Sequence, residues 1–401
     1  MGLVDQGLFS ASNLLISVLL GRWLSEEQYG AFSISFSIFL ILSSVQVGLI
    51  FDPMVIYGPT RYKSNIIGYL QKLIYYQLIL TSMVSLVLIV VAQYFESHLR
   101  NSFVSIAICL PFILLYWFFR QACYMQLKPE IAARSSIIYS IIIILGLFFE
   151  KNFDMLSASN GYILMGFASI ISSLTTASSL KMLKIIPAQD ADRAIIFTHW
   201  NYGKWLVVSN VAVALSSFIY APILGIISGL SDAAIFKSLQ NFIQPIQQLM
   251  VVINLLVLPK LSSYRTENIK PSFINELKQL FKTYLIVVSG YFILLTPFSA
   301  LLLQLTYKNT LYSGFAYLIP IWGIATIISI LPRTLGTLFR VYEKSDYILW
   351  AKGISVIFLL TFGMLLIKFY NLEGAVISIL ISVILESIFM VLLYNKISIG
   401  Y

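Results

Sequence analysis

The chain has 401 residues, of which 59% are apolar and 11% charged, and its formal net charge is +9 at pH 7. Soluble domains carry about 25% charged residues, so this composition excludes a soluble multidomain protein and indicates a chain whose apolar side chains face lipid. The lysines and arginines are spread over many connections and do not gather on one folded face, which excludes a nucleic-acid-binding protein.

Apolar segments follow one another along the chain, and most of them reach the ~17–25 residues that a helix needs to cross a hydrocarbon core. The predicted spans are 3–20, 30–51, 73–95, 102–124, 135–150, 161–180, 204–228, 232–258, 283–305, 311–335, 347–367 and 372–394. The sequence therefore predicts an all-α polytopic membrane protein with about 12 transmembrane helices.

The first span has neither a basic leader nor a cleavage site, so we expect a retained helix and not a signal peptide.

Basic side chains crowd onto alternate connections between these spans. The even-numbered connections and the C-terminal tail hold 20 of the 26 lysines and arginines. Because positive charge stays on the cytoplasmic side of a membrane, we expect both termini to be cytoplasmic. The connections on the other side are short, and the longest lies around Glu150 to Asn160. We therefore expect no soluble domain on either face of the membrane.

The chain resembles itself at an offset of 204 residues. Leu20-Gly21 matches Leu224-Gly225, Gly30-Ala31-Phe32 aligns with Ala234-Ile235-Phe236, and Ser12 matches Ser216. In each half the second span is predicted to end at a proline, Pro53 or Pro259. Six spans per half is an even number, so we expect two parallel repeats that form pseudo-equivalent six-helix bundles. The predicted organisation is an N-terminal bundle over 1–180, a cytoplasmic amphipathic linker over 181–203 and a C-terminal bundle over 204–401.

Two predicted helices carry polar side chains at helical spacing. In span one the set is Gln6, Ser10, Asn13 and Ser17. In span eight it is Lys237, Asn241, Gln244 and Gln248. Steps of three and four residues place each set on one helix face. Small and polar residues serve helix packing in membranes, which is the interpretation favoured for the serines. For span eight we favour a water-filled cavity, because a lysine among several amides exceeds what packing needs.

Charged residues at or within the spans are candidates for binding or coupling. The cations are Arg22, Arg120, Lys237, Arg333 and Arg340, and the carboxylates are Asp5 and Glu386. Glu386 is the deepest of these charges, and a central charge costs roughly 2.5–3.5 kcal/mol on insertion scales. Two interpretations stay open for Glu386, a proton-binding site and a buried pair with a cation that the sequence does not identify.

Several kinds of chemistry are excluded or unsupported. The chain has no GxxxxGK[ST] loop, so it does not hydrolyse ATP itself. Its two histidines, His98 and His199, fall on connections on opposite sides of the membrane, and its two cysteines fall in one span. We therefore expect no metal site, no disulfide framework and no cofactor.

Two stretches carry a resemblance to a known family. The first is Asp5-Gln6-Gly7-Leu8-Phe9-Ser10-Ala11-Ser12-Asn13, followed by Gly21-Arg22-Trp23-Leu24 and Tyr29-Gly30-Ala31-Phe32. The second is His199-Trp200-Asn201-Tyr202-Gly203-Lys204-Trp205, followed by Pro245 and Leu258-Pro259-Lys260-Leu261. They resemble the Wzx-type polysaccharide flippases of the multidrug/oligosaccharidyl-lipid/polysaccharide (MOP) exporter superfamily. The chain departs from that family in lacking a lead-in before Asp5 and in its glutamine-rich span eight.

The resemblance implies two six-helix bundles in a V around a central cavity, working by alternating access in the bacterial cytoplasmic (inner) membrane. It implies a cargo of oligosaccharide on undecaprenyl diphosphate, moved to the outer leaflet for O-antigen, capsule or exopolysaccharide synthesis. A polysaccharide polymerase and a chain-length regulator are the candidate protein partners, and protons or sodium ions are the candidate coupling ions.

Roles for individual residues follow from that cargo, whose head carries a diphosphate and sugar hydroxyls. The candidate cations for the diphosphate are Arg22, Arg120, Lys237, Arg333 and Arg340. The candidate sugar contacts are Asn13, Asn241, Gln244 and Gln248, and the candidate ion-coupling carboxylates are Asp5 and Glu386.

Two other functions compete with the flippase. A multidrug antiporter of the same superfamily would share the fold, but its pocket should be apolar or anionic, whereas this one is predicted to be polar and cationic. A membrane glycan polymerase or ligase belongs to a different class, and the short outer connections leave little room for its catalytic surface.

Overall fold

The computed structural model of this protein describes residues 1–182, 193–267, 270–308 and 310–398. In these residues every secondary-structure element is a helix, so the predicted all-α fold class is confirmed. The chain divides into two compact units, Met1–Ala214 and Leu215–Tyr401.

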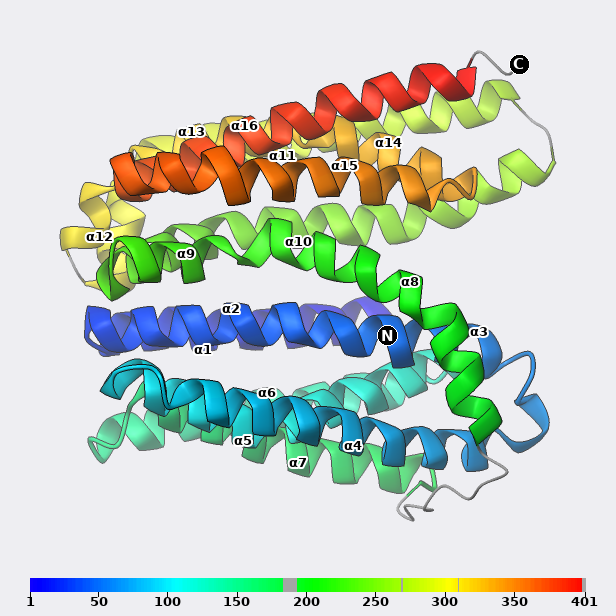
Figure 1. The fold of residues 1–401 in the computed structure, drawn as a ribbon, viewed down its shortest axis with the longest axis horizontal. Coiled ribbons are helices and arrows are strands. Elements are labelled where there is room, and N and C mark those ends of the chain that lie inside the picture. Colours follow the sequence, from blue (N-terminus) through cyan, green and yellow to red (C-terminus); the bar gives the residue numbers. More distant parts are fainter. Residues whose placement is uncertain (183–192, 268–269, 309, 399–401) are drawn as a thin grey trace. The chain divides into compact units, whose positions relative to one another are not determined.

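Unit 1 is a bundle made mostly of long helices. Its elements are α1 (Gly2–Trp23), α2 (Glu26–Gln46), the π-helix η1 (Val47–Phe51), α3 (Asp52–Tyr57), the 3-10 helix η2 (Lys63–Asn65), α4 (Ile66–Ala92), α5 (Ser97–Met125), α6 (Pro129–Asn152), α7 (Ala158–Ser179) and the first part of α8 (Arg193–Phe218). Figure 1 shows α4, α5, α6 and α7 running alongside one another, and α5 packs against both α4 and α7.

The starts of these helices follow from local sequence. The side chains of Ser25, Asn65 and Ser157 each accept a hydrogen bond from the backbone N–H three residues later. Such caps satisfy donors that the first helical turn leaves unpaired. Pro129 opens α6, where its missing N–H removes no helical bond.

Unit 2 is also a helical bundle, with several breaks inside its spans. Its elements are α9 (Tyr220–Ile227), α10 (Leu230–Thr266), α11 (Lys270–Tyr307), α12 (Thr310–Gly314), α13 (Leu318–Ile328), α14 (Ile330–Val341), α15 (Ser345–Phe358), the π-helix η4 (Leu359–Gly363) and α16 (Met364–Ser398). Within the unit, α16 packs against α9, α13 and α15, and α10 packs against α11.

The helices have the length and composition that membrane crossing requires. Ten described helices can span by these criteria, or eleven if α8 and α9, which are bent by 51° at their junction, count as one span. The range Ser345–Lys396 contains both of the last two predicted spans and is divided at Asn371, whose backbone is non-helical. Counted in this way, the helices match the twelve predicted spans, and the chain is a multi-pass membrane protein.

Prolines act differently at different places. Pro222 has no N–H to bond the Phe218 carbonyl, and the bend between α8 and α9 lies at that turn. The prediction that Pro53 and Pro259 end their spans is wrong. The helix continues past Pro53 because this residue stands in the first turn of α3, after the π-turn, where a proline is tolerated. Pro259 lies inside α10, which runs on to Thr266.

A hydrogen bond and close backbone packing join the π-turn η1 to the first part of α8. Because a carbonyl only accepts, Nδ1 of His199 donates to the Leu49 oxygen at 2.9 Å, and Nε2 therefore accepts from the Tyr69 hydroxyl at 2.8 Å. The backbones also meet closely, since a Cβ atom at Gly203 would lie 2.6 Å from the Gly48 carbonyl oxygen. Glycine at both positions allows this approach.

The boundary between units lies inside predicted span seven, because the first part of α8 packs with unit 1. The predicted amphipathic linker over 181–203 lies in part outside the described residues, and its last residues form the start of α8. Packing does not report where an ancestral repeat ends, so the boundaries 1–180 and 204–401 stay a prediction, as does the cavity between the bundles.

Asn371 offers a test of the break in α16. Its φ of 47° and ψ of −121° lie in a region that glycine adopts easily and other residues rarely do. We expect Asn371→Gly to keep or raise stability by up to about 1 kcal/mol, and Asn371→Val to lower it by about 1–3 kcal/mol. The apparent melting temperature of the purified protein in detergent measures both. Asn101→Val, at an exposed site in α5, is the control, and an equal loss in both valine variants contradicts the prediction.

Candidate functional site

A buried ion pair joins α1 to α5 in unit 1. Arg120 donates through Nη2 to Oδ2 of Asp5 at 2.7 Å and through Nε to Oδ1 at 3.4 Å. Asp5 is fully buried and Arg120 is 6% exposed. The Tyr124 hydroxyl also donates to Oδ2 of Asp5, and the Ser136 hydroxyl to Oδ1. Two helices, α5 and α6, thus supply hydrogen bonds to one carboxylate on α1, as a buried charge requires.

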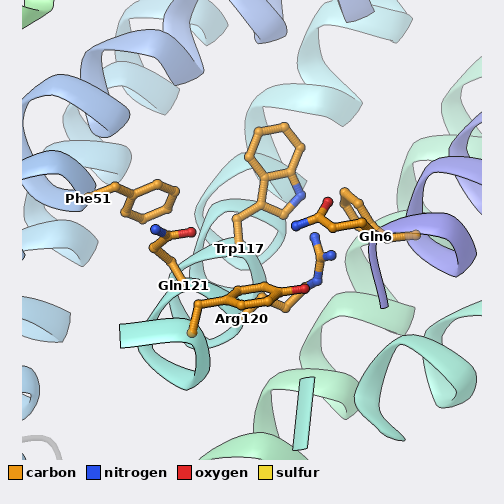
Figure 2. A pocket seen from close by; sticks show the side chains of 7 residues that line it. Gln6, Phe51, Trp117, Arg120 and Gln121 are labelled. Atoms are coloured by element: carbon orange, nitrogen blue, oxygen red, sulfur yellow. The ribbon is translucent and has the colours of Figure 1, made fainter. Parts of the chain in front are cut away.

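The guanidinium of Arg120 also faces a pocket of about 160 Å³ in unit 1. The lining residues are Gln6, Phe9, Phe51, Trp117, Arg120, Gln121 and Tyr124. Figure 2 shows the Gln6 amide and the Arg120 guanidinium turned toward one another, with Phe51 on the opposite side of the pocket. Its donors are the two amides, an indole N–H and the guanidinium, whereas the Tyr124 hydroxyl proton is donated to Asp5.

Aromatic rings form the rest of the pocket wall. The guanidinium carbon of Arg120 lies 3.9 Å from the ring centroid of Phe9, a cation–π distance. Phe9 meets Trp117 edge to face, with ring centroids 6.0 Å apart. The pocket therefore combines apolar faces with neutral and charged donors.

The other predicted residues of α1 lie away from this pocket. Arg22 is in the last turn of α1, 17 residues from Asp5, which corresponds to about 26 Å along a helix. Ser17 bonds the Tyr29 hydroxyl at 3.1 Å, in line with the packing interpretation of the serines, and Asn13 is half-buried. The structure thus joins Asp5 to Arg120 and separates both from Arg22.

The polar face of α10 points partly into unit 2. Lys237 is 4% exposed and donates to Oε1 of Gln240 at 3.1 Å. Asn241 is similarly buried and donates through Nδ2 to the Tyr307 hydroxyl at 2.9 Å. Gln244 is half-buried and Gln248 is exposed. The predicted set thus runs from the interior of the unit to its surface.

A second ion pair lies in unit 2. Nζ of Lys352 on α15 lies 2.8 Å from Oε2 of Glu386 on α16. Of the two interpretations of Glu386, the pairing with a cation is thus confirmed, and proton binding is not tested. Arg333 on α14 is close enough to Glu386 for their charges to interact, and Arg340 is exposed at the end of α14. The structure therefore gathers Arg333, Lys352 and Glu386 in one region.

Some of these residues were missed by sequence reasoning. Tyr124 lies one helical turn after Arg120, so a search for i, i+4 partners finds it. Gln121 is next to Arg120 in the chain. Ser136 and Lys352 lie on neighbouring helices, and no local pattern links them to Asp5 or Glu386.

No protein-family model matches the chain, and no curated protein matches it in sequence. Solved structures do match in fold. An inward-facing multidrug resistance MATE family transporter of the MOP superfamily superposes with a TM-score of 0.79 at 13% identity, over 100% of this chain and 98% of that one. The lipid II flippase MurJ, in an inward closed conformation, gives 0.77 at 14% identity, over 98% and 87%. A MOP superfamily transporter from Pyrococcus furiosus gives 0.68 at 11% identity, over 100% and 94%.

The chain has the fold of the MOP-superfamily transporters. The match extends over nearly the whole length of each chain, so both units take part in it. At 11–14% identity the likeness concerns the fold alone.

Proposed function

We propose that this protein is a flippase that moves lipid-linked oligosaccharide from the cytoplasmic to the outer leaflet of a bacterial inner membrane. Undecaprenyl diphosphate is the proposed carrier, and the cargo is a repeat unit of a surface polysaccharide. The motif resemblance to Wzx-type flippases and the fold shared with a lipid II flippase both support this proposal. On this proposal the protein is a transporter and not an enzyme, and both termini are cytoplasmic.

The observation that carries the proposal is that Asp5, the carboxylate bonded to two residues of the pocket wall in unit 1, is already paired. Asp5 accepts from Arg120, Tyr124 and Ser136, and none of the described residues that line the pocket is acidic. A drug pocket should be apolar or anionic to hold organic cations, and the wall of this one carries amides and a guanidinium. The donor-rich surface suits a cargo rich in oxygen acceptors instead.

The two candidate coupling carboxylates are both in ion pairs. A proton or sodium ion that binds Asp5 has to compete with Arg120, and one that binds Glu386 has to compete with Lys352. We propose that coupling, if carried by either residue, proceeds through opening of its ion pair. Arg22, Arg333, Arg340, Asn13, Gln244 and Gln248 remain proposed cargo contacts.

The decisive experiment locates the lipid-linked oligosaccharide in cells that lack this protein. A membrane-impermeant glycan-modifying enzyme reports whether the head group faces outward. We expect the oligosaccharide to stay in the cytoplasmic leaflet and to return outward when the gene is restored. Single repeat units that face outward indicate a polymerase or ligase instead. An unchanged leaflet distribution together with altered drug sensitivity indicates an antiporter.

Lys237 gives a residue-level prediction. We expect Lys237→Ala to reduce surface glycan display by about tenfold or more at normal protein level, because a charged hydrogen-bond donor contributes about 1.5–3 kcal/mol. Surface labelling and immunoblotting measure the two quantities. Lys282→Ala, at an exposed position on α11, is the matched control. Normal display in the Lys237 variant removes this residue from the proposed cargo path.

A further inference from the structure

The pocket in unit 1 contains a cation but has little net charge. The Asp5 carboxylate lies 2.7 Å from the Arg120 guanidinium, directly behind the pocket wall. At a short distance from such a pair the two opposite fields largely cancel. The guanidinium has five N–H donors, and its two bonds to Asp5 leave others for a ligand. The pocket therefore offers donors without the excess positive charge that a diphosphate needs.

We infer that this pocket binds the ring of one neutral sugar of the cargo, and that the diphosphate is bound elsewhere in the protein. This inference rests on the proposed function and names the part of the cargo that unit 1 recognises. It also changes the role predicted for Arg120, from a cation for phosphate to a donor for sugar hydroxyls.

The size of the pocket fits a single ring. A protein cavity of about 150 Å³ accommodates a benzene ring, and this pocket measures about 160 Å³. A six-membered sugar ring is larger than benzene because of its hydroxyls, but hydroxyls at the rim can remain in solvent. A disaccharide or a whole diphosphate-linked head exceeds this volume.

The lining of the pocket fits the two kinds of surface that a sugar presents. The C–H faces of a pyranose are apolar and pack against aromatic rings, which Phe9, Phe51 and Trp117 supply. The hydroxyls around the ring edge both donate and accept hydrogen bonds. Gln6 and Gln121 can do the same, since each amide has two donors and an acceptor.

Glutamines are better suited than charges to discriminate among neutral sugars. A site that bonds a particular hydroxyl disfavours an analogue that lacks it, because the half-buried amide then loses a partner. The two glutamines approach from different helices, Gln6 from α1 and Gln121 from α5. We therefore expect the positions of hydroxyls around the ring to determine which sugar binds.

The test is equilibrium binding to the full-length protein in detergent micelles, followed by tryptophan fluorescence. The probes are the methyl glycosides of common hexoses and N-acetylhexosamines, with inorganic pyrophosphate as the charged comparison. The chain has 6 tryptophans, so the contribution of Trp117 is the difference between the wild type and Trp117→Phe. We expect at least one glycoside to change the Trp117 signal saturably and independently of salt, and pyrophosphate not to change it.

One double variant, with a matched control, tests the amides directly. We expect Gln6→Leu/Gln121→Leu to weaken glycoside binding by about tenfold or more with an unchanged melting temperature, because two neutral hydrogen bonds are lost. Gln93→Leu is the matched control, because the Gln93 side chain bonds the Ile89 carbonyl of its own helix at 3.1 Å and is exposed. No saturable glycoside signal, or a Trp117 signal that responds only to pyrophosphate, overturns the inference, as does full affinity in the double variant.

The leaflet experiment separates this inference from the proposed function. If glycosides bind at the pocket but gene loss leaves the leaflet distribution unchanged, the proposed flippase function is overturned and the inference of a sugar pocket stands. If gene loss traps the cargo in the cytoplasmic leaflet but no glycoside binds at the pocket, the flippase function is supported and the inference of a sugar pocket is overturned.

Discussion

Replacing Asp5 with alanine is expected to destabilise the protein by about 3–5 kcal/mol, because it leaves the Arg120 guanidinium buried without its counter-ion. The loss also removes the acceptor for the hydroxyls of Tyr124 and Ser136. The apparent melting temperature of the purified variant in detergent, together with its yield in the membrane, measures the effect.

A double replacement distinguishes a lost ion pair from a lost side chain. Apolar residues of similar volume often replace a buried pair without loss of stability, so we expect Asp5→Leu/Arg120→Met to recover at least half of the deficit. Glu130→Ala removes an exposed carboxylate from the first turn of α6 and is the control. An Asp5→Ala protein as stable as this control shows that the ion pair contributes nothing to stability.

The second large effect is expected for Gly48→Ala, because α8 passes too close to allow a side chain there. A Cβ atom at Gly48 would lie 2.7 Å from the backbone nitrogen of Val207 and 2.9 Å from its Cα. Backbone atoms cannot relieve the clash by changing rotamer, so α8 has to move away from η1. Overpacking of this kind lowers stability by about 1–3 kcal/mol. Thermal unfolding in detergent measures the loss.

Gly7 provides the matched control for this prediction. It also lies in a helix of unit 1, but a Cβ atom built there meets nothing within 4 Å. Because alanine favours the helix over glycine by about 1 kcal/mol, we expect Gly7→Ala to be neutral or stabilising. If both alanine variants have the same melting temperature, the close approach of η1 and α8 is absent in solution.

The spans were predictable because membrane crossing imposes a simple requirement of length and apolarity on every helix. The same requirement says little about what a proline does. Pro53 and Pro259 stand at the predicted ends of their spans, yet the helix continues past each of them. Whether a proline ends a helix depends on which carbonyl it leaves without a hydrogen bond and on which side chains pack around that carbonyl. The local sequence encodes neither.

The residues of the site were predictable singly, and their grouping was not. Asp5 and Arg120 both stood out as charges near the end of a span, but 115 residues separate them. Helix order in a bundle decides that α1 meets α5, and hydropathy does not encode that order. The same holds for Glu386: pairing with a cation was one of two interpretations from the sequence, and the identity of the partner, Lys352, follows only from the packing of α15 on α16.

The π-turn over Val47–Phe51 also sets the rotational phase of the helical residues after it. Each residue in an α-helix advances the chain by about 100° around the axis, so one additional residue in a turn rotates all later side chains by about that angle. Phe51 contributes to the pocket wall, and the next residue, Asp52, accepts from Asn210 at 3.0 Å. Deleting one residue from this turn would rotate both side chains away from those neighbours, so the irregularity fixes the direction in which the end of this membrane span presents its functional groups.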